Sequence, residues 1–213
     1  MPAARPSATK RGADTPLALL RAAEQLFSER GVDAVSLREI AAAAGQANHS
    51  AATYHFDNKR DLLNSILDRH SAPIRRAWSA TLKHMDGEGR CSLEELVGLL
   101  VRSIVAKLDD EDGGCAYLLI VADLVTSRSF PLTSMPAVSA PEAADLSIRM
   151  MNHLPPIPSD WMQLRMMRVA AVLYCSIANY HSLDLVDAAP SREGFVADLI
   201  STLVAVIKAE AVL

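Results

Sequence analysis

The segment from Ser36 to Lys59 places two short helical patterns on either side of a glycine, and this pairing restricts the fold more than any other feature. The first pattern opens at Ser36, with Glu39 three residues later as in a capping box. Its apolar residues recur at helical spacing until Gly45, a residue type that commonly ends helices. The second pattern, at about 48–56, carries small, polar and aromatic residues in place of an apolar face. Two short helices joined by a tight turn predict a helix-turn-helix, whose second helix enters the DNA major groove.

The composition favours an all-α protein. Half of the 213 residues are apolar, aromatic residues are few, and there are only nine glycines. Strand-like alternation is absent, whereas apolar residues recur at helical spacing through most of the chain. We therefore expect about nine helices. They lie at about 15–30, 36–44, 48–56, from Asn58 towards Pro73 with a resumption through Trp78 and Leu82, 92–104, 115–126, a helix through Met150 and Met151, 159–183 and 191–210.

Simple features of the chain argue against several classes of protein. The three cysteines, at positions 91, 115 and 175, share no CxxC spacing, which argues against a zinc site or a disulfide framework. Residues 1–14 lack the apolar core of a signal peptide, and the most apolar run, 115–125, is too short to span a bilayer. We therefore expect a cytoplasmic protein that does not enter a membrane and that holds no metal and no cofactor.

The formal net charge of −4 is unevenly distributed. Residues 1–70 hold nine Lys or Arg against eight Asp or Glu, whereas residues 71–213 hold twelve against seventeen. A near-neutral first part on an acidic second part suits local, specific DNA contacts better than general binding to a polyanion. Residues 1–13 are basic and rich in Pro and Gly, and we expect a disordered arm there. This arm either touches DNA or is an ordinary frayed terminus.

A recognition helix needs one narrow buried side and a free outer side. Ala52 and Phe56 stand four residues apart and can seat this helix against the apolar residues of the two preceding helices. The other side chains carry amide, imidazole and hydroxyl groups that can read base edges or touch phosphates. The candidate DNA contacts are Asn48, His49, Ser50, Thr53 and Tyr54, with Lys59 as a further phosphate contact.

Three separated segments carry a resemblance to a known family: A-A-E-Q-L-F-S-E-R-G, S-L-R-E-I-A-A-A-A-G and Y-H-F-D-N-K-R-D-L-L. In this order and spacing they resemble the N-terminal domain of TetR-family transcriptional repressors, over about residues 15–68. The stretch from Gly45 to Phe56 departs from the family pattern, because it is one residue longer than in most members. This insertion leaves open which of Asn48, His49 and Ser50 meets a base.

The resemblance implies roles for single residues. Arg38 would contact a base or a phosphate, and Lys59 would bind a phosphate. Thr53, Tyr54 and His55 match the segment that meets DNA at the end of the recognition helix. The alternatives are a solvated helix residue for Arg38, an aromatic side chain packed on the next helix for Tyr54, and a histidine wedged between helices for His55.

The resemblance also implies a helix-turn-helix DNA-binding domain at 14–57 and a helical effector-binding and dimerisation domain at 58–213. TetR-like proteins are homodimers whose last two helices form a four-helix bundle across a two-fold axis. The closing helices support this independently, because both are apolar on two sides. In 159–183, one stripe contains Val169 and Leu173 and another contains Leu164 and Met167. The alternative is a monomer with a thick core.

The effector pocket of the family lies among the helices that precede the dimer pair. The candidate lining residues are Leu100, Ile104, Tyr117, Ile120, Leu124, Met150, Met151 and Tyr174. Their mostly apolar character predicts a hydrophobic or amphipathic effector, although a methionine stripe also suits an ordinary core. Asp123, alone in an apolar helix, would either anchor a cationic ligand or face a loop, and His153 suits a helix end better than a ligand contact.

These features predict a dimeric repressor that binds a pseudo-palindromic DNA operator and is released from it by a small-molecule effector. An activator or an architectural protein with the same DNA-binding domain is the alternative. The sequence shows no nucleophile elbow, metal-ligand cluster, glycine-rich phosphate loop or close pair of carboxylates. We therefore do not expect an enzyme, and a small-molecule carrier is equally unsupported.

Overall fold

The computed structural model describes residues 9–45, 56–88, 91–154 and 157–210, and all the regular structure in these ranges is helical. The helices are α1 (Thr9–Arg30), α2 (Leu37–Ala43), α4 (Lys59–Glu88), α5 (Leu93–Val105), α6 (Gly114–Thr126), α7 (Pro141–Met151), α8 (Ser159–Asp184) and α9 (Arg192–Lys208), with short 3₁₀ turns η1 (Ala106–Asp109) and η2 (Leu132–Ser134). The all-α prediction is confirmed. None of the described helices is both long enough and apolar enough to cross a membrane.

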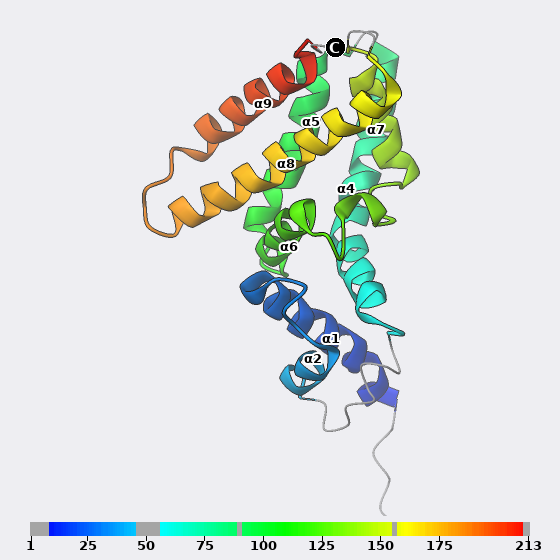
Figure 1. Ribbon diagram of the computed structural model, residues 1–213, viewed down its shortest axis with the longest axis vertical. Coiled ribbons are helices and arrows are strands. Elements are labelled where there is room, and N and C mark those ends of the chain that lie inside the picture. The colour runs from blue at the N-terminus through cyan, green and yellow to red at the C-terminus, as the bar shows by residue number, and fades with distance from the viewer. Residues whose placement is uncertain (1–8, 46–55, 89–90, 155–156, 211–213) are drawn as a thin grey trace, which may run out of the picture.

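The helices form two groups that meet end to end (Figure 1). The first group, α1 and α2 together with Phe56, is called the head below. The second group, α4 to α9, is called the body. In the body α8 lies against α6 and α9, and α9 also lies against α5, while α4 runs from the head along the body to its far end. The head touches the body mainly through α1, which packs on α6 and α4.

The head is built on the predicted local signals. The Ser36 hydroxyl accepts a hydrogen bond from the Glu39 amide (3.3 Å), and the Glu39 carboxylate accepts one from the Ser36 amide (2.8 Å), so the capping box forms. Phe27, Ile40 and Phe56 are buried in one cluster. Ala52 and the rest of the predicted helix at 48–55 lie outside the described residues.

Two helix boundaries differ from the sequence prediction. Helix α1 begins at Thr9 and not near Thr15, so residues 9–13 of the predicted disordered arm are helical. Helix α4 continues through Pro73 without a break. A proline inside a helix removes one hydrogen bond and costs about 3 kcal/mol. Here Ile66 and Leu67 before it and Trp78 after it are all buried, and burying both halves of one apolar stripe offsets that cost.

The second capping box and the two closing helices lie close to the predicted positions. Ser92 caps α5 through Glu95 in the same reciprocal way as in the head. Helix α5 is fixed to α4 by a hydrogen bond from the Trp78 indole to the Ser103 hydroxyl, at 2.7 Å. Helix α9 follows its N-cap Ser191 and ends at Lys208, two residues before the predicted Glu210.

The capping box in the head makes its stability depend on pH. The pKa of Glu39 is lowered from 4.5 to about 2, first by the Ser36 amide and then by the Ser36 hydroxyl and Arg30. A lowered folded-state pKa adds stability that is complete above pH 4.5 and is lost as the pH falls towards 2. We therefore expect Glu39→Gln to lower the free energy of unfolding above pH 4.5. The difference in the free energy of unfolding between the variant and the wild type should shrink as the pH falls.

Urea unfolding of both proteins between pH 6 and pH 3 measures this difference. Glu210→Gln, at an exposed position beyond α9, is the matched control and should leave the pH profile unchanged. A gap between wild type and Glu39→Gln that stays constant from pH 6 to pH 3 would contradict the capping role of the charge.

Candidate functional site

The predicted DNA-contacting residues divide into those that the structure describes and those that it does not. Arg38 lies exposed on α2 and makes no hydrogen bond or ion pair with any other described residue. Lys59 lies at the first position of α4. The remaining candidates lie outside the described residues and stay predictions: Asn48, His49, Ser50, Thr53, Tyr54 and His55.

Lys59 has a different surrounding from the one expected of a phosphate-binding lysine. Its ammonium group donates hydrogen bonds to the carbonyl oxygens of Val32 (2.8 Å), Asp33 (3.3 Å) and Val35 (2.9 Å), and lies 5.5 Å from the ring centre of Phe130. An ammonium group has three N–H donors, and all three are used. In this conformation Lys59 therefore fastens the loop between α1 and α2 to α4, and a phosphate would have to replace these carbonyls. Carbonyl partners leave no trace in a sequence, so this role was not predicted.

The body contains a partly open apolar cavity of about 200 Å³ between α4, α5, α6, α7 and α8. Its wall combines aliphatic and aromatic side chains with a few polar groups. Five of the predicted lining residues reach it: Leu100, Ile104, Tyr117, Met150 and Tyr174. Most of the remaining wall comes from residues of α4, from residues of α7 before Met150 and from the segment before α7, none of which the sequence prediction named for the cavity.

Three predicted lining residues do not reach this cavity and are corrected here: Ile120, Leu124 and Met151. Tyr117 and Val121, four residues apart on α6, share the face that borders the cavity. Ile120 and Leu124 share a neighbouring face of α6 and are fully buried elsewhere in the core. Met151 follows Met150 on α7 and is turned about 100° away from it. An apolar helix gives no sequence signal for which of its buried faces borders a hollow.

Two tyrosines, Tyr117 and Tyr174, contribute polar hydroxyl groups to the mostly apolar cavity wall. The hydroxyl groups of Tyr117 and Tyr174 lie close enough to each other for each to influence the pKa of the other. Burial raises the pKa of both hydroxyls, that of Tyr117 well above its ordinary value, so both remain neutral. The cavity thus presents uncharged hydroxyl groups and no phenolate.

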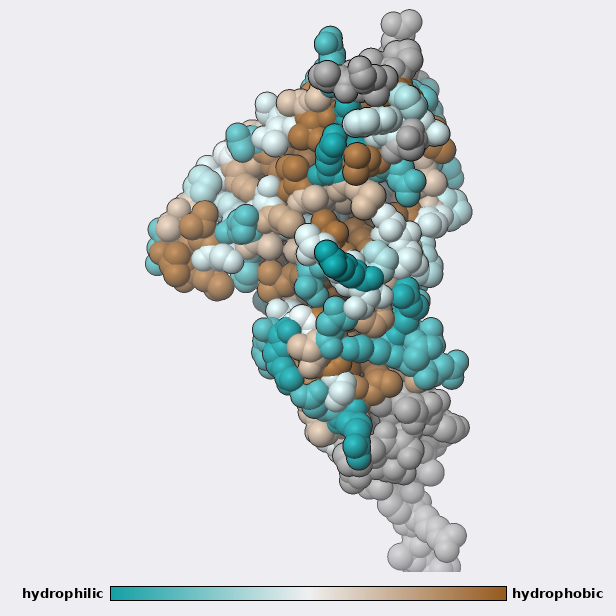
Figure 2. Space-filling view, in the orientation of Figure 1, coloured by the Kyte–Doolittle hydropathy of each residue, from teal (hydrophilic) through white to brown (hydrophobic). Residues whose placement is uncertain are grey.

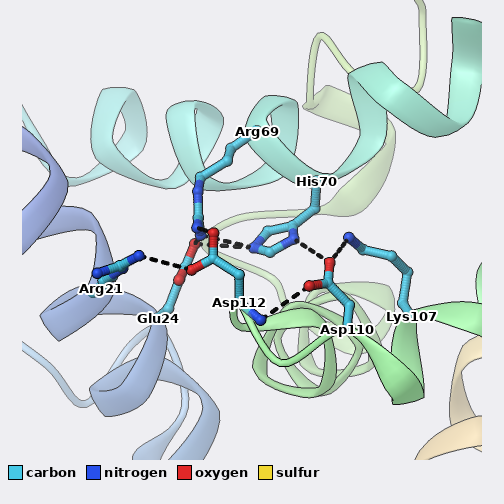
Figure 3. A network of polar contacts seen from close by, with 7 residues as sticks. All are labelled: Arg21, Glu24, Arg69, His70, Lys107, Asp110 and Asp112. Atoms are coloured by element: carbon cyan, nitrogen blue, oxygen red, sulfur yellow. Dashed lines mark hydrogen bonds and ion pairs between the residues drawn. The ribbon is translucent and has the colours of Figure 1, made fainter.

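A network of charged side chains joins the head to the body next to this cavity (Figure 3). It is called the junction network below and consists of Arg21, Glu24, Arg69, His70, Lys107, Asp110 and Asp112. Glu24 of α1 and His70 of α4 are each only 3% exposed. The Glu24 carboxylate lies 2.6 Å from Arg69 Nη1 and 3.0 Å from His70 Nε2. A buried carboxylate is costly unless it is paired, and here two side chains of α4 pair it.

The segment before α6 contributes further contacts to the junction network. Asp112 pairs with Arg69 and with Arg21 (3.0 Å), and the hydrogen bond from Arg69 lowers the pKa of Asp112. Gly113 adopts a left-handed conformation (φ +88°), and a Cβ there would lie 2.7 Å from a carboxylate oxygen of Glu24. A residue with a side chain at this position would therefore displace the buried carboxylate.

The junction network touches the cavity wall through one aromatic contact. The His70 ring stacks on the Tyr117 ring with centroids 5.0 Å apart and planes at 26°. Tyr117 also lines the cavity. A continuous set of contacts therefore leads from the cavity through Tyr117 and His70 to Glu24 in the head.

A second link between α6 and the head involves Asp123. Its carboxylate accepts a hydrogen bond from the Val32 amide at 3.1 Å, in the loop that follows α1. Of the two sequence interpretations, the structure supports the loop-facing one and not the anchor for a cationic ligand. His153 lies exposed just after α7 and does not line the cavity, in keeping with a helix-end residue.

Comparison with known proteins places the similarity in the head and the start of α4. Residues 19–66 match the family described as "Bacterial regulatory proteins, tetR family". The chain is 46% identical over 61 residues to the HTH-type transcriptional repressor BepR of Brucella suis, a match covering 29% of each chain. It is 41% identical over 59 residues to the HTH-type transcriptional repressor Rv3405c of Mycobacterium tuberculosis, covering 28% of this chain and 31% of that one. The similarity thus spans less than a third of these relatives.

A solved structure resembles the chain over almost its whole length. The crystal structure of a HlyIIR mutant protein aligns with 96% of this chain and 100% of that chain, at a TM-score of 0.51 and 15% identity. At this identity the likeness concerns the fold alone. It supports the arrangement of a small helical head on a larger helical body.

The junction network gives a prediction about stability. Glu24→Gln keeps the shape of the side chain but leaves Arg69 and His70 without their buried negative partner. We expect the free energy of unfolding to fall by about 1–3 kcal/mol, as for other buried groups that lose a charged partner. Urea or thermal unfolding at neutral pH measures the loss.

Glu29→Gln, on the same helix, is the matched control because Glu29 is exposed and bonds only Gln25 across one turn, at 3.0 Å. It should change the free energy of unfolding by less than about 0.5 kcal/mol. Equal effects of the two substitutions would show that the junction network adds nothing to stability.

Proposed function

We propose that the protein is a dimeric cytoplasmic repressor whose effector binds in the body cavity. The match of residues 19–66 to the tetR family of bacterial regulatory proteins supports this proposal. The single observation that carries this proposal is the continuous contact from that cavity through Tyr117 and His70 to Glu24 in the DNA-binding head. The relatives named as transcriptional repressors support a regulator and not an enzyme.

DNA binding would use the head and the residues that follow α2. Arg38 is exposed on α2, has no partner among the described residues and can donate to a base edge or a phosphate. The candidates at 48–55 would supply the base contacts, with the longer turn setting their register. An effector acts only if it binds more tightly to a conformation that misplaces the heads. The stack of His70 on Tyr117 is where a ligand that moves the cavity wall would shift α4 against α1.

Dimerisation would use the α8–α9 pair. One α8 stripe is buried inside the protomer, including Val169, Leu173 and Ile177. The other stripe leaves large apolar side chains in solvent: Trp161 (37% exposed), Leu164 (41%) and Met167 (43%). Figure 2 shows further apolar surface at the far end of this helix pair, where Leu183, Leu185 and Val186 are exposed. Unpaired apolar surface of this extent favours a protein partner, and a two-fold copy of the same face is the simplest one.

The dimer predicts a defined mutational effect. Leu164→Glu would place a charge in an apolar interface of about 1,000 Å² or more. We expect the dissociation constant of the dimer to rise at least tenfold, which is about 1.4 kcal/mol. Analytical ultracentrifugation over a range of protein concentrations measures it. Ile148→Glu on α7 is the matched control, because Ile148 is 52% exposed but lies off the α8–α9 pair. A wild-type protein that is monomeric at all concentrations would refute the dimer.

DNA binding is tested with duplexes taken from upstream of the protein's own gene. We expect these to bind more tightly than unrelated duplexes, with an affinity that falls steeply with salt. Arg38→Ala should weaken operator binding by about 1–3 kcal/mol if Arg38 reads a base. If Arg38 binds a phosphate, the slope of the logarithm of the binding constant against the logarithm of the salt concentration should fall in magnitude by about one. Fluorescence anisotropy at several salt concentrations distinguishes these outcomes.

Arg102→Ala, at an exposed position on α5 in the body, is the control for this substitution and should bind DNA like wild type. A wild-type protein that binds all duplexes alike would refute a specific repressor. An unchanged affinity and salt slope for Arg38→Ala would remove Arg38 from the DNA contacts.

A further inference from the structure

Arg75 is the only charged residue in the wall of the cavity, as far as the chain is described. It lies on α4 and its side chain is 11% exposed. Its Nη1 donates to the Ser71 hydroxyl and its Nη2 donates to Asp68 at 2.7 Å. Its Nε is buried and has no hydrogen-bond partner among the described residues, the nearest carboxylate oxygen of Glu142 being 3.9 Å away. A buried N–H group without an acceptor is costly, so this group is a candidate ligand contact.

The two neighbouring tyrosines supply a second unused donor. Each hydroxyl carries one O–H donor, and even where one hydroxyl donates to the other, the second proton is free to bond elsewhere. Tyr117 and Tyr174 both border the cavity, and no further acceptor for their hydroxyls is found in the described part of the chain. The cavity therefore offers two donors, the Arg75 Nε–H and one tyrosine O–H. Both require an acceptor, such as a carbonyl oxygen.

The charge around Arg75 decides which kind of acceptor is favoured. Asp68 forms an ion pair with the guanidinium and Glu142 lies close to it on α7. One positive and two negative groups leave this site with a formal excess of one negative charge. A carboxylate on the ligand would be repelled by that excess negative charge. An ammonium group has only N–H donors, so it could not accept a hydrogen bond from either donor of the cavity. A neutral oxygen acceptor meets both conditions.

We propose that the cavity binds a small neutral carbonyl compound, a ketone or an ester, with its oxygen towards Arg75 and the tyrosine pair and its hydrocarbon part against the apolar wall. This proposal rests on the proposed function only in taking the cavity as the effector site. The carbonyl oxygen accepts hydrogen bonds and no covalent bond is formed. The apolar wall from α4 to α8 supplies the affinity, and the two donors supply the selectivity.

The volume of the cavity limits the size of the ligand. An apolar protein cavity of about 150 Å³ holds benzene, so one of about 200 Å³ suits a slightly larger molecule. Four matched probes of about eight non-hydrogen atoms cover the alternatives at this size. They are 2-heptanone as the neutral acceptor, hexanoate as the anion, heptylammonium as the cation and octane as the hydrocarbon without an acceptor.

Calorimetric titration of the full chain with each probe tests the proposal. We expect 2-heptanone to bind at least tenfold more tightly than each of the other three. Equal or tighter binding of hexanoate or heptylammonium overturns the proposal, as does a failure of 2-heptanone to bind.

Two variants locate the binding. Arg75→Met removes the guanidinium donors and keeps an unbranched side chain that reaches about as far as Nε, and Tyr174→Phe removes one of the two hydroxyls. We expect each substitution to lower the affinity for 2-heptanone about tenfold and to leave the affinity for octane unchanged. Arg76→Met, at the exposed neighbouring position, is the matched control and should bind all probes like wild type. If Arg75→Met fails to fold, because Asp68 and Glu142 lose their partner, Tyr174→Phe carries the test. A preference for the ketone that survives both substitutions overturns the assignment.

A DNA-binding measurement with the same probes separates this proposal from the proposed function. Binding of 2-heptanone in the expected pattern without any loss of operator affinity supports the site and refutes the effector role. Release of the operator by hexanoate, with no effect of 2-heptanone, supports the effector role and overturns the neutral carbonyl ligand.

Discussion

The buried carboxylate of Glu24 is the contact on which the arrangement of this protein depends. It lies on α1 in the head and is paired with Arg69 and His70 of α4 in the body. Breaking a buried ion pair leaves uncompensated charge in the protein interior, which costs several kcal/mol. A small displacement of the head that breaks these contacts while the side chains stay buried would do this at once to three side chains. The head is therefore attached to the body by a contact that resists gradual loosening and favours discrete positions.

These contacts connect the wall of the cavity to the head. His70 pairs with Glu24 through its Nε2 and stacks on Tyr117 with its ring face. Asp123 provides a second link from α6 to the loop after α1, and Lys59 fastens the same loop to α4. Helix α4 thus holds the head at two places, through the partners of Glu24 and through Lys59, and helix α6 holds it through Asp123. A change in their spacing on ligand binding would be carried into the orientation of α1 and α2.

Local signals in the sequence predicted most of the fold, and tertiary contacts decided the rest. Ser36 and Ser92 each stand three residues before a glutamate, and both capping boxes form as predicted. Pro73 was expected to interrupt its helix, but the helix is continuous, because burial on both sides of Pro73 depends on helices far away in the sequence. Glu24 looks like an ordinary solvated residue in A-A-E-Q, because its burial requires α4 and the bare backbone of Gly113 to meet α1. Arg75 escaped prediction for the same reason, since only the folded chain shows a donor left without an acceptor.

Native-state hydrogen exchange of the full chain tests the attachment of the head most directly. If Glu24 and its partners hold the head to the body, the slowest amides of α1 and those of α4 around His70 should exchange with the same opening free energy and the same denaturant dependence. In Glu24→Gln the α1 amides should then open at lower free energy than those of α4. Independent opening of α1 in the wild-type protein, well below the opening free energy of α4, would contradict a head and a body that move as one.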